Sequence, residues 1–220
     1  MENLLTPTKI VKTNRKTLSL IINNKGEFIV RAPFNYKDSV IFDFINKKAN
    51  WIIKKRTEML ENNIKPLKLI DGEQISLLGQ TYIIQLAKVK SVKIKDNYLI
   101  IPTLNTKARL VAYLKQTLKR IIEEKISKIN QVYDFQYKNI SISSAKTNWG
   151  SCSGSNNLHF TYKLILCPEQ VIDYIIVHEL VHTIIKNHSK TYWRNVKKIY
   201  PYYKECERWL KDNRAITELI

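Results

Sequence analysis

The sequence predicts an α+β fold, in which an N-terminal antiparallel β region packs on a C-terminal part built from helices and strands. Two observations predict it. Short segments of alternating polar and apolar residues, separated by turn residues, recur through residues 1–104. Apolar residues at helical spacing dominate residues 105–220. We therefore expect a β-rich region with one helix at residues 1–104 and a second, more helical region at residues 105–220.

The length and composition are those of a globular protein. The chain has 220 residues, of which 44% are hydrophobic and 25% charged, and these values exclude disordered and fibrous classes. Lys and Arg number 37 against 19 Asp and Glu, which gives a formal net charge of +18. This charge could attract a nucleotide or nucleic acid. Compositional drift is the favoured interpretation, because the positive charge is spread along both halves of the chain instead of clustering.

Cysteine content and hydropathy bear on location. The three cysteines, Cys152, Cys167 and Cys206, are odd in number and widely spaced, unlike the denser even set of a secreted disulfide scaffold. Residues 1–16 contain no apolar stretch of the kind that a signal peptide has. No apolar run reaches the length of a membrane span. We expect a cytoplasmic protein that does not contact a membrane.

The elements of the first region follow from its periodicity. Two alternating segments with turn residues at 23–26 between them predict a hairpin of residues 17–23 and 27–32. Apolar residues at helical spacing from Asp38 predict one helix, which ends at Asn62 and Asn63. Four further antiparallel strands are expected at residues 74–78, 80–86, 89–94 and 98–101.

The second region begins with a long helix at residues 106–133, which has one apolar stripe. Strands are expected at residues 140–144 and 157–166, on either side of a loop at residues 149–154. Exposed backbone near residues 157–161 could hold an extended peptide as an added strand. Pro168 is suited to the first turn of the next helix, which continues through His178.

That helix carries the motif H-E-x-x-H, from His178 to His182. Imidazoles four residues apart lie on one face of a helix, one turn from each other, and can share one metal ion. Glu179 is placed to accept a proton from water bound to that metal. The motif therefore predicts a zinc site in which Glu179 is the catalytic base.

His188 is the candidate for a third ligand. In a continuous helix it would lie about 9 Å further along the axis and on another face, so it can join the site only if the helix ends first. Asn187 tolerates the left-handed conformation that ends many helices, and Ser189 can cap a new helix that begins at Lys190. The spacing H-E-x-x-H-x5-H is that of the metzincins, although Ile185 replaces their turn glycine and no Met-turn is found.

Other residues offer alternatives at the same site. Glu205 or Glu207 could supply a carboxylate ligand in place of His188. Cys152 could be a fourth ligand, but a structural thiol is favoured because no second cysteine lies at ligand spacing. His159 is interpreted as a packed or solvated side chain, with a place in the substrate cleft as the alternative.

At this point the chain resembles the YgjP-like metallopeptidases, which are bacterial zincin-like proteins related more distantly to SprT-like and WLM-type metalloproteases. The resemblance extends over nearly the whole chain. It is most specific in WGSCS at residues 149–153, DYIIVHELVH at residues 173–182 and NHSKTYW at residues 187–193. It implies a zincin-like second region, with His178, His182 and His188 as zinc ligands and Glu179 as the catalytic acid and base. The family usually has Arg before Trp-Gly-Ser-Cys, where this chain has Asn148.

Three functional hypotheses follow. The leading one is a zinc-dependent hydrolase, most plausibly a peptidase that acts on a peptide or protein. The second keeps the metal but makes the substrate a nucleotide, as in a pyrophosphohydrolase; no Gly-rich phosphate-binding loop is visible. The third is a basic protein associated with nucleic acid, in which the metal only stabilises the fold.

Overall fold

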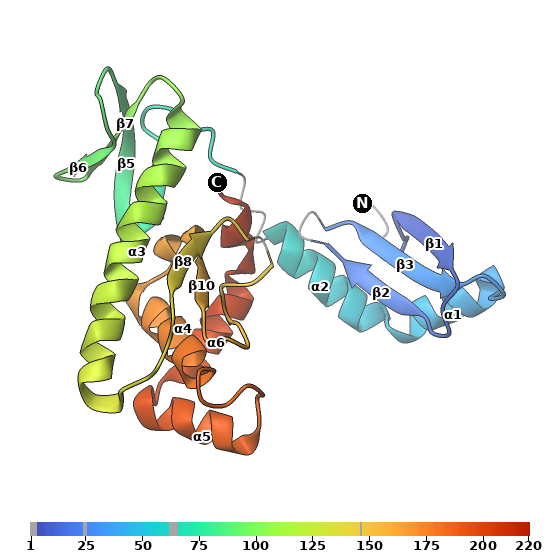
Figure 1. The fold of residues 1–220 in the computed structure, drawn as a ribbon. Helices are drawn as coiled ribbons and strands as arrows, with labels where there is room; N and C mark the ends of the chain where they lie inside the picture. The colour runs from blue at the N-terminus through green and yellow to red at the C-terminus, as the bar shows by residue number, and fades with distance from the viewer. Residues whose placement is uncertain (1–3, 24–25, 62–65, 146) are drawn as a thin grey trace. The chain divides into compact units, whose positions relative to one another are not determined.

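The chain forms two compact units, Met1–Lys65 (unit 1) and Pro66–Ile220 (unit 2). The structure, a computed structural model, describes residues 4–23, 26–61, 66–145 and 147–220 (Figure 1). The division falls about forty residues before the boundary expected near Asn105. The switch from strand to helix at Asn105 is a sharp turn inside unit 2, where Asn105 has a left-handed φ of 55°. The Thr106 hydroxyl donates to the carbonyl of Pro102 across this turn.

Unit 1 is a three-stranded sheet covered by two helices. Its strands are β1 (Lys9–Thr13), β2 (Ser19–Ile22) and β3 (Phe28–Pro33), and its helices are α1 (Asp38–Lys47) and α2 (Ala49–Glu61). Alternate residues of β3 are fully buried and pack with buried isoleucines of the helices; this core consists of Phe28, Val30, Ala32, Ile41, Ile45 and Ile52. The predicted hairpin of β2 and β3 is confirmed, whereas β1 was not predicted. The single helix expected from Asp38 is wrong, because the chain interrupts it at Lys48, the C-cap of α1. The turn residues at 24–25 and the predicted helix end at Asn62 and Asn63 lie outside the described residues.

Unit 2 opens with a four-stranded sheet of order β4-β5-β7-β6. The strands are β4 (Gln74–Leu77), β5 (Gln80–Ala87), β6 (Lys93–Lys95) and β7 (Tyr98–Pro102). Three of them are close to the predicted segments, whereas β6 is shorter and begins later than the strand expected at residues 89–94. This sheet belongs with the helical part of the chain, because β7 packs on the following helix and Leu78 donates its N–H to the carbonyl of Ile165.

A third sheet of order β8-β10-β9 lies beside the long helix α3 (Thr106–Tyr133). Its strands are β8 (Ile140–Ser143), β9 (Gly150–Cys152) and β10 (Leu158–Thr161), so part of the predicted loop at 149–154 is a strand. The expected strand at 157–166 ends early, and Tyr162–Leu166 form a buried 3-10 helix. Strand β10 pairs with β8 on one side and with β9 on the other, so its backbone is not exposed. The expectation that residues 157–161 could bind a peptide as an added strand is therefore wrong. The edge strands of this sheet are β8 and β9.

The three sheets share one topology that corrects the expected antiparallel pairing. In each sheet a later strand inserts between two earlier ones, parallel to one and antiparallel to the other. Periodicity places residues on faces of a sheet but does not specify which strand lies beside which, and the expectation therefore assumed sequential neighbours. The predicted α+β class is confirmed.

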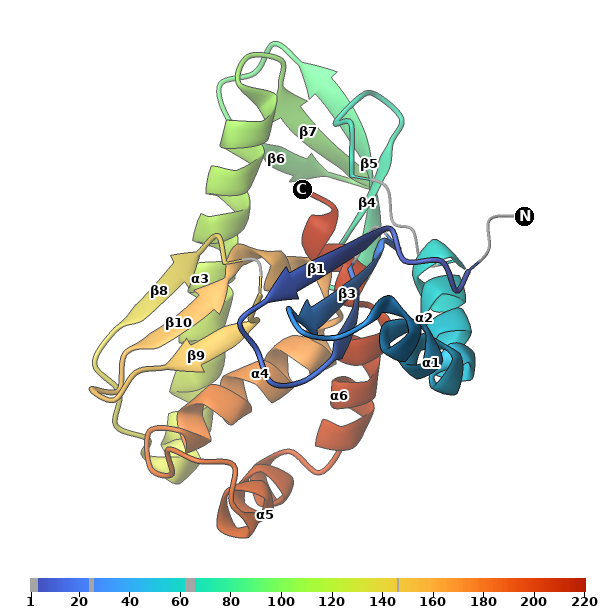
Figure 2. The same ribbon diagram turned by 90° about the vertical axis from the view of Figure 1, so that its right-hand side faces the viewer.

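The last ninety residues hold the helices that frame the candidate site. These are α4 (Glu169–Val181), α5 (Lys190–Ile199), α6 (Tyr203–Asp212) and a short 3-10 helix (Arg214–Glu218). Helix α4 packs against α3, α5, α6 and β9, and Figure 2 shows β9 on the side of its sheet nearest α4. Most of α4 is buried: Val171, Ile172, Tyr174, Ile175, Ile176, Val177, Glu179, Leu180 and Val181. Among the described residues, no helix is long and apolar enough to cross a membrane.

Candidate metal centre

The last turn of α4 and the residue after it present two imidazoles to one point. His178 lies in the helix, and His182 caps its C-terminus with helical φ and ψ of −66° and −14°. The two ring centroids are 5.0 Å apart. Burial lowers the pKa of His178 to about 3, and the neighbouring His182 and His188 add to this effect. In the folded chain His178 is therefore neutral at physiological pH and offers a lone pair.

His188 meets this pair from outside the helix. Its Nε2 lies 3.1 Å from Nε2 of His182 and 3.3 Å from Nε2 of His178. One nitrogen from each of the three residues lies within 4.8 Å of the other two. The side chain is exposed, but its nitrogen faces the other imidazoles instead of solvent.

Helix α4 ends at Val181 with His182 as its C-cap, before the position that the sequence indicated. Asn187 does not have the expected left-handed φ; its side-chain oxygen instead accepts the N–H of Ser189. Ser189 is the N-cap of α5, as predicted, and its hydroxyl accepts the N–H of Tyr192. The Lys186 ammonium donates to the carbonyl of Ser153 (2.9 Å) and to the Asn156 side chain (2.5 Å), which ties this segment to the turn after β9.

Hydrogen bonds on the far side of two rings set their tautomers. Nδ1 of His182 lies 2.9 Å from the carbonyl of Ile185, which can only accept, so Nδ1 carries the proton and Nε2 has the lone pair. Nδ1 of His178 lies 3.4 Å from the Tyr174 hydroxyl, which itself donates to Glu207 at 3.3 Å. His178 therefore donates to Tyr174 and also turns a lone pair toward the cluster.

These lone pairs make the cluster fit a metal ion. Nε2 of His178 and Nε2 of His182 are both acceptors, and a proton on His188 could satisfy only one of them, so a cation is the partner that suits all three. Nitrogens bound at about 2.0–2.1 Å to one tetrahedral zinc ion stand about 3.3–3.4 Å apart. The observed separations of 3.1 and 3.3 Å are close to this value.

Glu179 lies against the edge strand β9. A Cβ atom built on Gly150 would stand 2.7 Å from Oε1 of Glu179 and 2.8 Å from its Cγ, closer than real Cβ contacts. The carboxylate therefore occupies the space that a side chain at position 150 would fill. Burial raises the pKa of Glu179 from its ordinary value of 4.5 to about 8. Such a value suits a group that both accepts and releases a proton near neutral pH.

Two aromatic residues of α5 enclose the imidazoles. Tyr192 is fully buried, stacks on His182 with ring centroids 4.4 Å apart, and donates its hydroxyl to the carbonyl of His178 at 3.1 Å. Trp193 stacks on His188 with ring centroids 5.7 Å apart. Tyr192 is therefore a packed residue beside His182, and Trp193 packs against the ring of His188.

The remaining candidates lie outside the cluster. Glu207 accepts from Tyr174, Glu205 is exposed, and neither carboxylate belongs to a metal-binding group found in the described part of the chain. His159 is exposed, and its Nδ1 contacts the Ser141 hydroxyl at 2.6 Å. Cys152 is half-buried and lies 3.5 Å from the Lys186 ammonium. Its thiol has a pKa raised by burial, an effect that Lys186 partly offsets.

Sequence reasoning missed three residues that support the site, namely Tyr174, Lys186 and Gly150. Tyr174 lies four residues before His178, a spacing that places both side chains on one helix face and could have indicated the contact. The contacts of Gly150 and Lys186 join segments about thirty residues apart in the chain, and no local pattern encodes them.

An α+β protein whose H-E-x-x-H helix meets a third imidazole belongs to the class of metal-dependent hydrolases. Comparison with known proteins gives the family. The sequence matches the YgjP-like metallopeptidase domain over residues 16–213, so the chain belongs to the YgjP-like metallopeptidase family and is a hydrolase of this type. This confirms the resemblance seen in the sequence.

The chain was also compared with solved structures and with curated proteins. Among solved structures, the chain is similar to the metallopeptidase zymogen of Pyrococcus abyssi, abylysin, with 23% sequence identity and a TM-score of 0.37. The match covers 41% of this chain and 92% of that chain. No curated protein matches the sequence.

Proposed function

We propose that the protein is a zinc-dependent peptidase in which His178, His182 and His188 hold the ion and Glu179 is the catalytic base. The observation that carries the proposal is the convergence of three imidazole nitrogens, two with lone pairs fixed by Ile185 and Tyr174. Zinc held by three imidazoles supplies a Lewis acid and lowers the pKa of water to about 7. The cytoplasm is the proposed location, since all three thiols are free.

Glu179 is suited to move the proton of the reaction. Its carboxylate adjoins the first imidazole in sequence and is buried between α4 and β9. It would accept a proton from the attacking water and then donate this proton to the leaving amine. Contact with Gly150 limits the positions that the carboxylate can take, so the proton-accepting oxygen is held by packing on one side.

The backbone of β9 is suited to hold an extended substrate. The N–H of Thr161 donates to the carbonyl of Trp149, and the N–H of Ser153 donates to that of Asn157. Because antiparallel hydrogen-bonded pairs alternate, Ser151 faces β10, whereas Gly150 and Cys152 turn their backbone groups to the outer edge. A peptide that pairs with this edge would lie beside Glu179.

The test of the proposal is the substitution Glu179→Gln. The purified wild-type protein should contain about one zinc ion per chain and cleave unstructured peptides. The variant should keep its zinc but lose activity by roughly 10²–10⁴-fold, the usual contribution of a general base. Zinc content is measured by elemental analysis and cleavage by mass spectrometry.

The same assay also tests the other two functional hypotheses. Nucleotide triphosphates are offered alongside the peptides. Turnover of nucleotides alone, abolished in Glu179→Gln, would contradict the peptidase proposal in favour of a pyrophosphohydrolase. If the protein binds zinc tightly but turns over neither substrate, the metal would have a structural role. Salt-dependent binding to DNA would then support the nucleic-acid hypothesis.

A further inference from the structure

A small cavity lies in unit 2 beside the end of α4 and the segment that follows His182. Nε2 of His182 faces the other imidazoles, whereas its Nδ1 faces the carbonyl of Ile185. Ile185 and Val181 line a cavity of about 190 Å³. The end of α3 and one side of α5 complete its walls with Tyr133, Phe135, Asn195 and Ile199. We call this cavity the α3–α5 pocket.

The pocket is open and apolar at its rim. Ile184, which also lines it, is 68% exposed, and Tyr133 is 37% exposed. Val132, next to Tyr133 in the chain, is 75% exposed. Isolated exposed apolar residues are ordinary, but a group of them around a concavity marks a binding surface. The volume admits one large side chain and is below that of a cofactor site.

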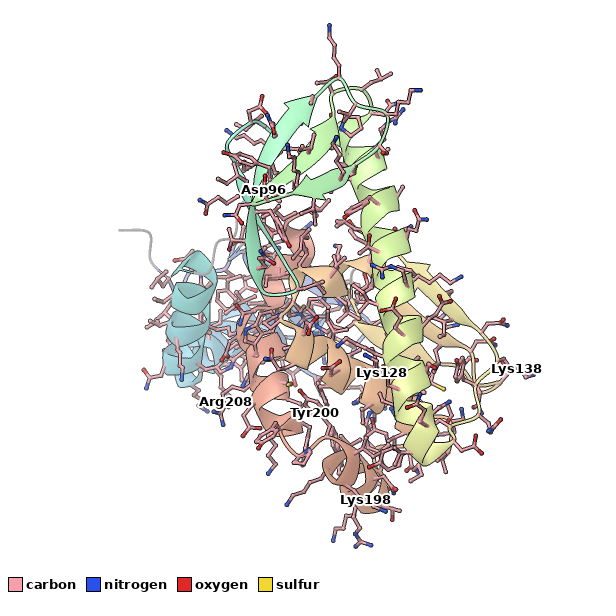
Figure 3. The ribbon with its side chains drawn as sticks, turned by 90° about the vertical axis from the view of Figure 1, so that its left-hand side faces the viewer. Asp96, Lys128, Lys138, Lys198, Tyr200 and Arg208 are labelled. Carbon is pink, nitrogen blue, oxygen red and sulfur yellow. The ribbon has the colours of Figure 1, made fainter. Side chains whose placement is uncertain are left out.

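Positive charge lies on α5, the helix that forms one wall of the pocket. Lys198 belongs to its lining, and α5 also carries Lys190, Arg194 and Lys197 without any acidic residue. Within the described ranges, none of these four cations forms an ion pair. The acidic residue adjacent to the lining, Asp134, accepts a hydrogen bond from Gln136 at 2.9 Å. Figure 3 shows Lys198 on α5 and Lys128 on α3 on the same face of unit 2.

We propose that the α3–α5 pocket is an exosite for peptide substrates, which anchors one large apolar side chain within an acidic stretch. The proposal rests on the proposed peptidase function and names its substrate class. The apolar lining matches the anchor, and the unpaired cations of α5 match the flanking carboxylates. Because none of the three imidazoles lines the pocket, a segment anchored there leaves the cluster open.

The test measures binding without turnover. Fluorescence anisotropy is recorded for a labelled twelve-residue peptide that carries one Phe among Glu residues, with full-length, zinc-loaded Glu179→Gln protein. We expect Ile184→Asp in this background to weaken binding at least tenfold, and Lys198→Glu to weaken it about threefold to tenfold, with stronger binding at low salt. Lys95→Glu is the matched control, because Lys95 is an exposed cation of β6 at the other end of unit 2 (Figure 1).

Three results would overturn the exosite. The first is that Ile184→Asp binds the acidic peptide as tightly as the parent protein. The second is that a peptide in which Ser replaces Phe binds as tightly as the original peptide. The third is that single-stranded DNA binds as tightly as the peptide and competes with it for the same residues. Cleavage of short neutral peptides by wild-type protein is measured separately. Protein that cleaves these peptides but does not bind the acidic peptide refutes the exosite alone. Protein that binds the acidic peptide but cleaves nothing refutes the proposed function alone.

Discussion

His178 and His182 are held in a different way from His188. His178 and His182 are fixed by α4, a helix that is buried on nearly every side. His188 belongs to a segment that leaves the helix and is exposed over most of its length. Its position depends on the Ser189 cap, the Lys186 contacts and the stacked Trp193. A rigid helix thus presents a preformed pair, and a separate set of contacts brings the third nitrogen to it.

The strongest test of this difference removes one imidazole of the helix and, separately, the imidazole outside it. If all three hold one ion, His178→Ala and His188→Ala should each lower zinc affinity by more than the roughly 10–100-fold expected for an outer contact. Zinc content after dialysis against a graded chelator measures the effect. Full zinc occupancy in His188→Ala would show that His178 and His182 bind the ion without the third imidazole. His159→Ala is the control, because His159 lies outside the cluster.

A second prediction concerns the contact between α4 and β9. Gly150→Ala places a methyl group where Glu179 now lies, so the carboxylate must move. We expect peptide cleavage to fall about 10–100-fold, the order seen when a catalytic group is misplaced by about 1 Å. Zinc content should stay at the wild-type level.

The control for this prediction is Gly154→Ala. A Cβ at Gly154 would meet nothing within 4 Å, and neither Gly150 nor Gly154 has the positive φ that disfavours alanine. Equal activity of the two variants would mean that the position of Glu179 does not depend on Gly150.

A third prediction concerns the helix-held pair. Tyr174→Phe removes the hydroxyl that lies between His178 and Glu207, and His178 then loses the partner that orients its ring. Zinc affinity should fall about tenfold, at the lower end of the range for outer contacts. Tyr113→Phe, elsewhere in unit 2, serves as the control in the same chelator competition, and equal affinities would assign Tyr174 to packing alone.

The last prediction concerns stability. In the metal-free protein the pKa of Glu179 is raised to about 8, so between pH 4.5 and 8 the folded chain keeps a proton that the unfolded chain loses. The free energy of unfolding should therefore fall as pH rises through this window, by about 1 kcal/mol per pH unit at the steepest.

Urea unfolding in chelator, at pH values from 5 to 8, tests this by comparing wild type with Glu179→Gln. His178, with its pKa lowered to about 3, destabilises the fold as pH falls below 6.5, but it does so in both proteins and cancels in the comparison. A difference between the two proteins that stays constant with pH would contradict the assignment of a raised pKa to Glu179.

Local patterns predicted much of unit 2. The stripe of α3, the start of α4 and the Ser189 cap follow from periodicity and capping within a few residues of sequence, and all three are confirmed. The end of α4 was harder to predict. The helix ends at Val181, and Asn187 contributes through its side chain instead of through a left-handed backbone conformation.

Features that depend on distant segments could not be predicted in the same way. The alternation in β3 reveals its buried face, but the insertion of β3 between β1 and β2 is decided by packing between strands. The unit boundary near Lys65 depends on which elements β4 to β7 pack against, and the change of periodicity at Asn105 carries no such information. Glu207 reaches Tyr174 from 33 residues further along the chain.

The brevity of β9 has a consequence for self-association. An exposed strand edge can recruit the same edge of another copy and begin aggregation, and proteins limit this risk by keeping such strands short. At three residues, Gly150–Cys152 presents few backbone groups to a neighbouring molecule. Pairing of this edge with the same edge of another copy would therefore form only a few hydrogen bonds.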